Sequence, residues 1–201
     1  EALDNRLRVN GAAYFMQIND IILDYLPSPI LAPQLVESFN SGDTDVYGLE
    51  IDAQAAITDQ FIVGLNFSYL DYDFNDVYFP DGTDHTNTTE LVWAPKYAYA
   101  LTADYYVPTN VGEVRFNLNY SWQDDQFALA NTEFGKVEVE DYGLLNSRVS
   151  LADVKLAGNT WQFALWCRNL TDEDTANYKI GATALTYLAP LMWGAEVIFE
   201  F

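Results

Sequence analysis

The sequence predicts an all-β protein, an antiparallel transmembrane β-barrel segment of about eight strands. Three observations predict it: apolar and polar residues alternate with a period of two, short and long connections follow one another, and aromatic residues stand at the ends of the alternating segments. Of the 201 residues, 50% are hydrophobic and 15% are aromatic, so the chain is too apolar to be disordered.

The alternation defines each strand. It is unbroken at 49–55, where apolar Leu49 and Ile51 alternate with Glu50 and Asp52, and it recurs at 61–69 and 114–123. Further segments of this kind are 6–16, 97–107, 142–151, 161–169 and 193–201. Most approach the ~9 to 11 residues with which a tilted strand crosses a membrane. We expect Pro108 in a turn, because proline cannot donate to a strand ladder.

The connections between these segments differ systematically in length. Short links are predicted at 58–60, 108–112 and 155–159, and long loops at 24–43, 72–94, 124–141 and 171–191. The long loops hold most of the acidic residues. Short turns on one rim and long loops on the other are typical of an outer-membrane barrel.

The residues on the two faces of the strands indicate that one face contacts lipid and the other contacts water. Within 97–107, Tyr97 and Tyr105 flank the aliphatic Leu101 and Ala103, which is the pattern of two interfacial girdles around an apolar band. Alternation alone also fits a soluble antiparallel sheet with one wet face. The aromatic placement favours lipid on the apolar face and water on the opposite one. That opposite face carries Arg6, Arg8, Asn10, Glu50, Asp52, Gln54, Arg115, Asn117, Arg148, Gln162 and Arg168.

Composition excludes several classes of function. The net charge of -21 repels phosphate backbones, so we expect no nucleic-acid partner. Cys167 is the single cysteine and His85 the single histidine, which argues against a disulfide framework and against a zinc site. Cys167 falls on the lipid-facing register. The sequence also has no apolar run long enough for a membrane-spanning helix.

No motif predicts catalysis. The segment 71–76 (Asp-Tyr-Asp-Phe-Asn-Asp) resembles the start of a calcium loop, but Asp76 stands where glycine is required and Gly82 where glutamate is required. Glu50 and Asp52 are better explained as lumen partners of arginine. We therefore expect no enzyme activity, and we assign no catalytic, cofactor-binding or metal-binding residue.

Four segments carry a family resemblance. The last strand, 193–201 (Trp-Gly-Ala-Glu-Val-Ile-Phe-Glu-Phe), ends on an aromatic as outer-membrane barrels do, and 161–178 contains an Asn-Leu-Thr-Asp sequence. The segments 6–15 (Arg-Leu-Arg-Val-Asn-Gly-Ala-Ala-Tyr-Phe) and 46–52 (Val-Tyr-Gly-Leu-Glu-Ile-Asp) complete the set. Together they resemble the TonB-dependent receptors of the bacterial outer membrane.

The resemblance implies that residues 1–201 are the C-terminal portion of a barrel of about 22 strands, without the plug domain and the N-terminal strands. It implies TonB-driven uptake of a scarce nutrient such as a siderophore-iron complex, cobalamin or a carbohydrate, with no cofactor. The implied partners are outer-membrane lipid and lipopolysaccharide, the remainder of the barrel and plug, the TonB system, and the barrel-assembly machinery through the C-terminal strand.

Two alternatives stay open. A complete small eight-stranded barrel with an anchoring or adhesive role is one, because about eight strands can close a barrel by themselves. A soluble lipocalin-like carrier is the other. The sequence does not select a transported substrate or a ligand-binding loop.

Overall fold

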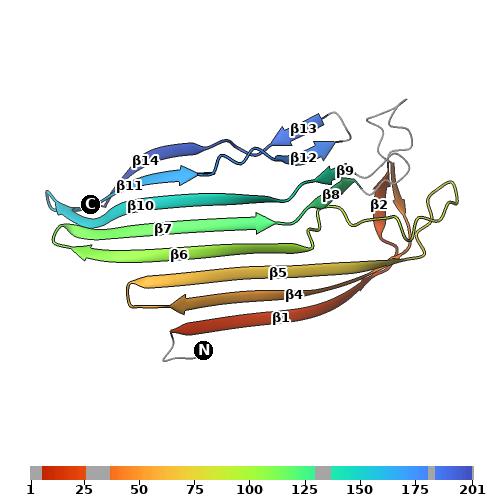
Figure 1. Ribbon diagram of the computed structural model, residues 1–201, viewed down its shortest axis with the longest axis horizontal. Coiled ribbons are helices and arrows are strands. Elements are labelled where there is room, and N and C mark those ends of the chain that lie inside the picture. The colour runs from red at the N-terminus through yellow and green to blue at the C-terminus, as the bar shows by residue number, and fades with distance from the viewer. Residues whose placement is uncertain (1–5, 26–36, 130–136, 181–183, 201) are drawn as a thin grey trace.

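The computed structural model describes residues 6–25, 37–129, 137–180 and 184–200. Eight long strands in these residues form one antiparallel sheet in which neighbours along the chain are neighbours in space (Figure 1). In spatial order they are β1 (Leu7–Ile18), β4 (Asp43–Ala56), β5 (Phe61–Asn75), β6 (Tyr97–Thr109), β7 (Gly112–Gln123), β10 (Tyr142–Leu156), β11 (Asn159–Arg168) and β14 (Met192–Glu200).

All eight predicted strands are confirmed, and several extend beyond their predicted ends, as β10 does to Leu156. Two of the differences concern residues discussed above. First, β4 and β5 extend to a paired segment in which Asp45 lies opposite Asp73, so acidic sequence that reads as loop continues the ladder. Second, the prediction for Pro108 is wrong, because this residue lies within β6 opposite Glu113. Its place next to the last residue of the strand explains why the missing N–H group is tolerated there.

The long connections contain strands of their own. Their described residues form three strand pairs: β2 (Ile22–Tyr25) with β3 (Glu37–Asn40), β8 (Gln126–Leu129) with β9 (Val137–Val139), and β12 (Ala176–Ile180) with β13 (Ala184–Tyr187), and we call each pair a hairpin. Figure 1 shows these hairpins at one end of the sheet, which we call the loop end, and the short turns at the opposite turn end. The predicted alternation of connection lengths is thereby confirmed.

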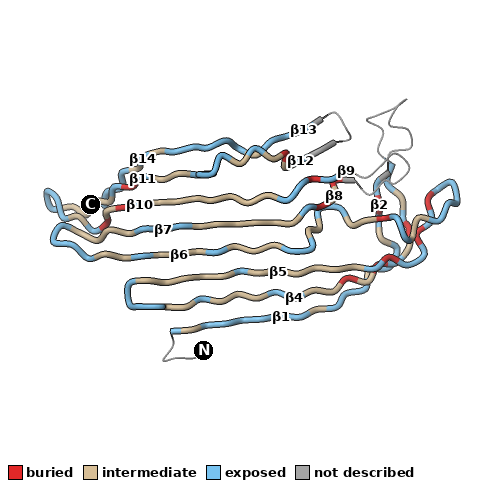
Figure 2. The backbone as a smooth tube through the Cα atoms, in the orientation of Figure 1, coloured by how far each residue is buried: buried red, intermediate tan, exposed pale blue. Residues whose placement is uncertain are grey.

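The register confirms the two predicted faces. One cross-strand row runs from Phe61 through Tyr105 and Phe116 to Val149 and Leu165. We call the face that carries this row the outer face. Its side chains are large, apolar and open to solvent: Leu165 is 64% exposed and Val197 of the same face 56%. Few residues along the strands are buried (Figure 2). A continuous exposed apolar surface of this extent is a membrane-facing surface.

In the described residues the eight-stranded sheet does not close into a barrel, and we call this sheet the wall. Its two edges are β1 and β14, and no ladder joins them. None of the described residues forms a helix of the length and hydropathy needed to cross a membrane.

A small hydrophobic core lies at the loop end. It consists of Leu23 from β2, Phe74 from β5, and Val77 and Phe79 from the following connection, each at most 9% exposed. Phe74 shares its register with Asn66 and Ser68, so this core lies on the inner face of β5. We call β2, β3 and residues 76–91 together the cap.

Candidate functional site

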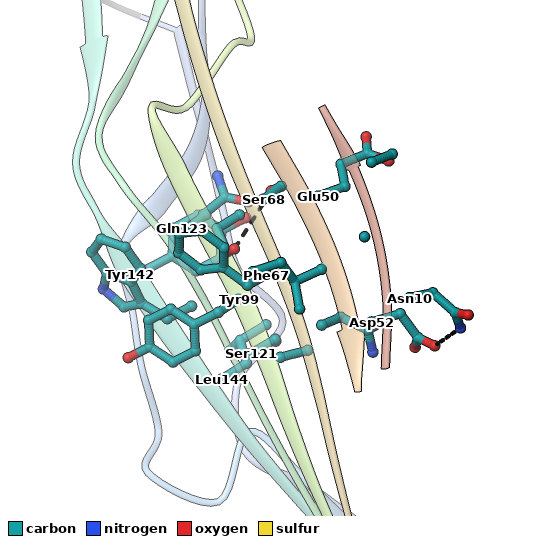
Figure 3. Close-up of a pocket in the computed structure, with 17 residues that line it drawn as sticks. Asn10, Glu50, Asp52, Phe67, Ser68, Tyr99, Ser121, Gln123, Tyr142 and Leu144 are labelled. Atoms are coloured by element: carbon teal, nitrogen blue, oxygen red, sulfur yellow. Dashed lines mark hydrogen bonds between the residues drawn. The ribbon is translucent and has the colours of Figure 1, made fainter. Parts of the chain in front are cut away.

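The inner face carries a shallow hollow of about 630 Å³ over the centre of β1, β4, β5, β6 and β7. Small side chains make room for it, among them Ala12, Ala98 and Ala100. Polar side chains of several strands border it, and Figure 3 shows Asn10 hydrogen-bonded to Asp52 at its β1–β4 side. Further polar lining residues are Glu50, Asn66, Ser68, Ser121, Gln123 and Tyr142.

Most arginines of the inner face pair with carboxylates, whereas Arg168 lies over the ring of Trp166, 5.5 Å from its centroid. Asp52 accepts a hydrogen bond from Asn10 (3.1 Å) and forms an ion pair with Arg8 (3.4 Å). Arg148 of β10 reaches across β11 to Glu196 of β14, at 2.8 Å. Asp52 thus has the arginine partner expected from the sequence, whereas Glu50 forms no ion pair with any residue that the structure describes.

Two further arginines follow the same rule near the turn end. Arg115 lies 2.7 Å from both Glu113 and Asp153, and the corresponding distance from Arg6 to Asp59 is also 2.7 Å. These side chains are partly exposed, so each pair contributes at most about 1 kcal/mol. Their role is to neutralise charge along a wet wall.

The carboxylates of the calcium-like segment are engaged in contacts at the loop end. Asp71 accepts hydrogen bonds from the hydroxyl of Tyr69 (2.7 Å) and from Lys96 (3.0 Å), and Asp73 accepts one from Tyr47 (3.4 Å). No group of three or more His, Cys, Asp or Glu side chains in the described ranges could hold a metal ion. The contacts of Asp71 and Asp73 join the loop ends of β4, β5 and β6.

The connection after β5 contains two ordered acidic turns. The hydroxyl and backbone N–H of Thr83 donate to Asp81 and lower the pKa of its carboxyl below the ordinary range. Hydrogen bonds from Thr86, led by its backbone N–H, lower the pKa of Asp84 in the same way. Both turns therefore keep their negative charge in mildly acidic solution.

The Asn-Leu-Thr-Asp sequence has a structural role. Asn169 is 4% exposed, and its side-chain amide donates to the carbonyls of Glu173 (2.8 Å) and Ala189 (2.9 Å). Its side-chain oxygen accepts the N–H of Glu173, and Asp172 accepts the N–H of Leu191. These bonds hold together the two ends of the connection between β11 and β14.

Sequence reasoning missed the contact between Trp93 and Tyr178 at the loop end. Trp93, just before β6, stacks on Tyr178 of β12, with ring centroids 5.1 Å apart and planes within 4° of parallel. The two residues are distant in sequence, and neither stands in an alternating segment. No local pattern could have found the pair.

Three solved structures with a similar fold are receptors for iron complexes. The ferric preacinetobactin receptor BauA from Acinetobacter baumannii matches 98% of this chain, which covers 27% of BauA, at 18% identity and a TM-score of 0.71. The yersiniabactin uptake receptor FyuA from Yersinia pestis matches 98% at 13% identity and a TM-score of 0.70, with 28% of FyuA covered. The ferric-catecholate import receptor Fiu from E. coli K12 matches 98% at 16% identity and 0.70, with 26% covered.

At these identities the structural likeness shows the fold. The chain spans about a quarter of the length of each of these receptors. The comparison with curated proteins returned no match. The family described as "TonB dependent receptor-like, beta-barrel" matches residues 2–170, which is most of the chain. Sequence and fold agree, and the chain belongs to the TonB-dependent receptor β-barrel family.

Proposed function

We propose that this chain is the C-terminal portion of the barrel of a bacterial outer-membrane transporter, and that the whole protein imports a scarce nutrient with energy from TonB. A siderophore-iron complex is the favoured substrate. The observation that carries the proposal is the match of 98% of the chain to BauA, a ferric preacinetobactin receptor, together with the family match over residues 2–170.

The geometry supports a wall that belongs to a larger cylinder. Its edges at β1 and β14 expose strand backbone groups, which must be paired inside a membrane because each unsatisfied group costs several kcal/mol there. The remainder of the barrel supplies the pairing strands, and the plug faces the inner surface. Lipid and lipopolysaccharide contact the outer face, and the barrel-assembly machinery engages the C-terminal strand.

The inner face supports transport and not catalysis. Several of its charged side chains form ion pairs along a wet surface, and the hollow combines small side chains with amides and hydroxyls. We assign no catalytic, cofactor or metal residue to it. Ligand binding involves loops of the whole receptor, including loops outside this chain.

Uptake measurements test this function. In a strain that lacks the full-length gene, transport of radioactive iron from a panel of ferric siderophores should fall for one or more members, and the loss should match that of a tonB deletion. Restoring the gene should restore uptake. Unchanged uptake of the whole panel under iron limitation would contradict a siderophore-iron substrate. Uptake that does not depend on TonB would contradict the proposed mechanism of import.

Cysteine labelling tests the topology. With Cys167→Ala as background, Asp81→Cys at the loop end should react with an impermeant maleimide in intact cells. Thr109→Cys at the turn end should react only after the outer membrane is opened. This follows because outer-membrane barrels have short turns on the periplasmic side and longer loops on the extracellular side. The reverse labelling pattern would refute that orientation.

The alternative of a complete small barrel has a direct test. Residues 1–201, expressed alone and refolded in detergent micelles, should aggregate or remain protease-sensitive, because both sheet edges stay unpaired. A monodisperse, heat-modifiable monomer would favour the small barrel with an anchoring role.

A further inference from the structure

Three consecutive residues of the connection before β6 contact three different parts of the loop end. Leu91 packs against the core of the cap. Val92 forms a parallel bridge with Phe127 of β8. Trp93 stacks on Tyr178 of β12. Residues 91–93 are therefore a short covalent link between the cap and the hairpins over the other half of the wall (Figure 1).

The backbone of this link is in an unfavourable conformation. Trp93 has φ = +57°, in the left-handed region that bulky residues rarely adopt. Its N–H donates to the carbonyl of Phe127 at 2.9 Å, and its ring rests on Tyr178. An unfavourable backbone persists only where the surroundings hold it, so these two contacts maintain the conformation.

The stack is a surface contact and can therefore separate. Trp93 is 41% exposed and Tyr178 is 43% exposed. Because both rings reach the surface, parting them would not leave a closed cavity. Release would also allow Trp93 to return to an ordinary backbone conformation, which offsets part of the lost contact.

Both ends of the link are firmly attached. On the cap side, the hydroxyl of Tyr72 donates to Glu90 at 2.6 Å, and that of Thr89 donates to the carbonyl of His85 at 2.9 Å. On the other side, β12 packs against β8 and β9. The segments next to residues 91–93 are therefore held in place, so a displacement of the cap must move the link itself.

We propose that residues 91–93 are a latch that couples the cap to the β8–β9 and β12–β13 hairpins. In the latched state Trp93 is stacked and left-handed, and a displacement of the cap is transmitted to β12. In the released state Trp93 leaves Tyr178, and the two halves of the loop end move independently. A molecule that contacts only one half would thus alter the other half through Trp93.

A double-mutant cycle tests the coupling by hydrogen exchange in the full-length receptor in detergent micelles. Phe79→Ala disturbs the cap core, because Phe79 is 7% exposed and its ring contacts Phe39. With Trp93 present, this change should speed amide exchange in β12 by about two- to tenfold, the range that corresponds to one aromatic contact. With Trp93→Ala in the background, Phe79→Ala should leave β12 exchange unchanged.

Two controls make the result specific. Tyr78→Ala removes a 52% exposed aromatic side chain of the same connection and should leave β12 unchanged. Trp93→Gly tolerates the positive φ but lacks the ring, and should uncouple the two halves as Trp93→Ala does. Heat-modifiable mobility should remain that of the wild type in all variants, since the wall is not altered.

The proposal is overturned by either of two outcomes. One is that Phe79→Ala has no effect on β12 in the otherwise unaltered receptor. The other is that its effect is the same with and without the Trp93 ring, because coupling would then run through another contact.

Discussion

Replacing Leu101 by arginine should strongly destabilise the barrel, because it places a charge at mid-depth in the membrane. In β6, Leu101 lies midway between Tyr97 and Tyr105, which pair with Tyr69 and Phe61 in the two aromatic girdles. At ~3.3 Å per residue, each girdle is about 13 Å away along the strand. Leu101 is 46% exposed on the outer face.

The size of the effect follows from that position. An arginine on the lipid face costs about 2 to 4 kcal/mol at the bilayer midplane. At ~1.4 kcal/mol per factor of ten, the equilibrium between folded and unfolded receptor should fall by roughly 30- to 700-fold. Urea unfolding of the full-length receptor in lipid vesicles, followed by heat-modifiable mobility, measures this change.

The neighbouring residue gives a matched control. Ala100 lines the inner hollow between Asn66 and Ser121, so Ala100→Arg adds the same side chain to the same strand on the wet face. It should cost much less than Leu101→Arg. Equal destabilisation by the two variants, or a larger effect of Ala100→Arg, would refute the assignment of the lipid-facing register.

Two further predictions concern glycine contacts and pH. A Cβ added at Gly48 would lie 2.5 Å from the carbonyl oxygen of Tyr69, so Gly48→Ala should lower the unfolding free energy by about 1 to 3 kcal/mol. Gly11→Ala, whose nearest contact would be 3.7 Å, should be neutral in the same urea assay, and equal losses would contradict the packing argument. Hydrogen bonds from Thr83 lower the pKa of Asp81, so they stabilise this turn at neutral pH, and that stabilisation is lost as the pH falls below 3.8 through the lowered pKa. Thr83→Ala should move the carboxyl titration toward 3.8 by carbon NMR of the aspartate-labelled receptor, and an unmoved titration would disprove the cause.

The strands could be predicted because their signal is local. In β4 and β7 the side-chain direction alternates with every residue, and two different solvents select opposite residue types for the two faces. The pairing of neighbours along the chain then follows from the short turns. The arginines of the inner face were likewise placed by alternation alone.

The loop end could not be predicted, because its contacts join residues that are far apart in sequence. Leu23 and Val77 meet in one core although β3, β4 and β5 lie between them in the sequence. The hairpins are built from strands of three to five residues, too short for alternation to be recognised. The left-handed backbone of Trp93 is set by its partners, and nothing in its neighbours along the chain encodes it.

The location of the cap core has a consequence for how this protein responds to its surroundings. The wall depends on a surrounding hydrocarbon phase, since its large apolar side chains point outward. The cap buries Val77 completely in a core with Leu23, Phe79 and Phe74 of β5, and this core is stabilised because water is excluded from it. Detergent, lipid thickness and denaturant therefore act on the two parts through different physical forces. Melting of the receptor should be described by two transitions, one set by the amphiphile and one by the aqueous phase.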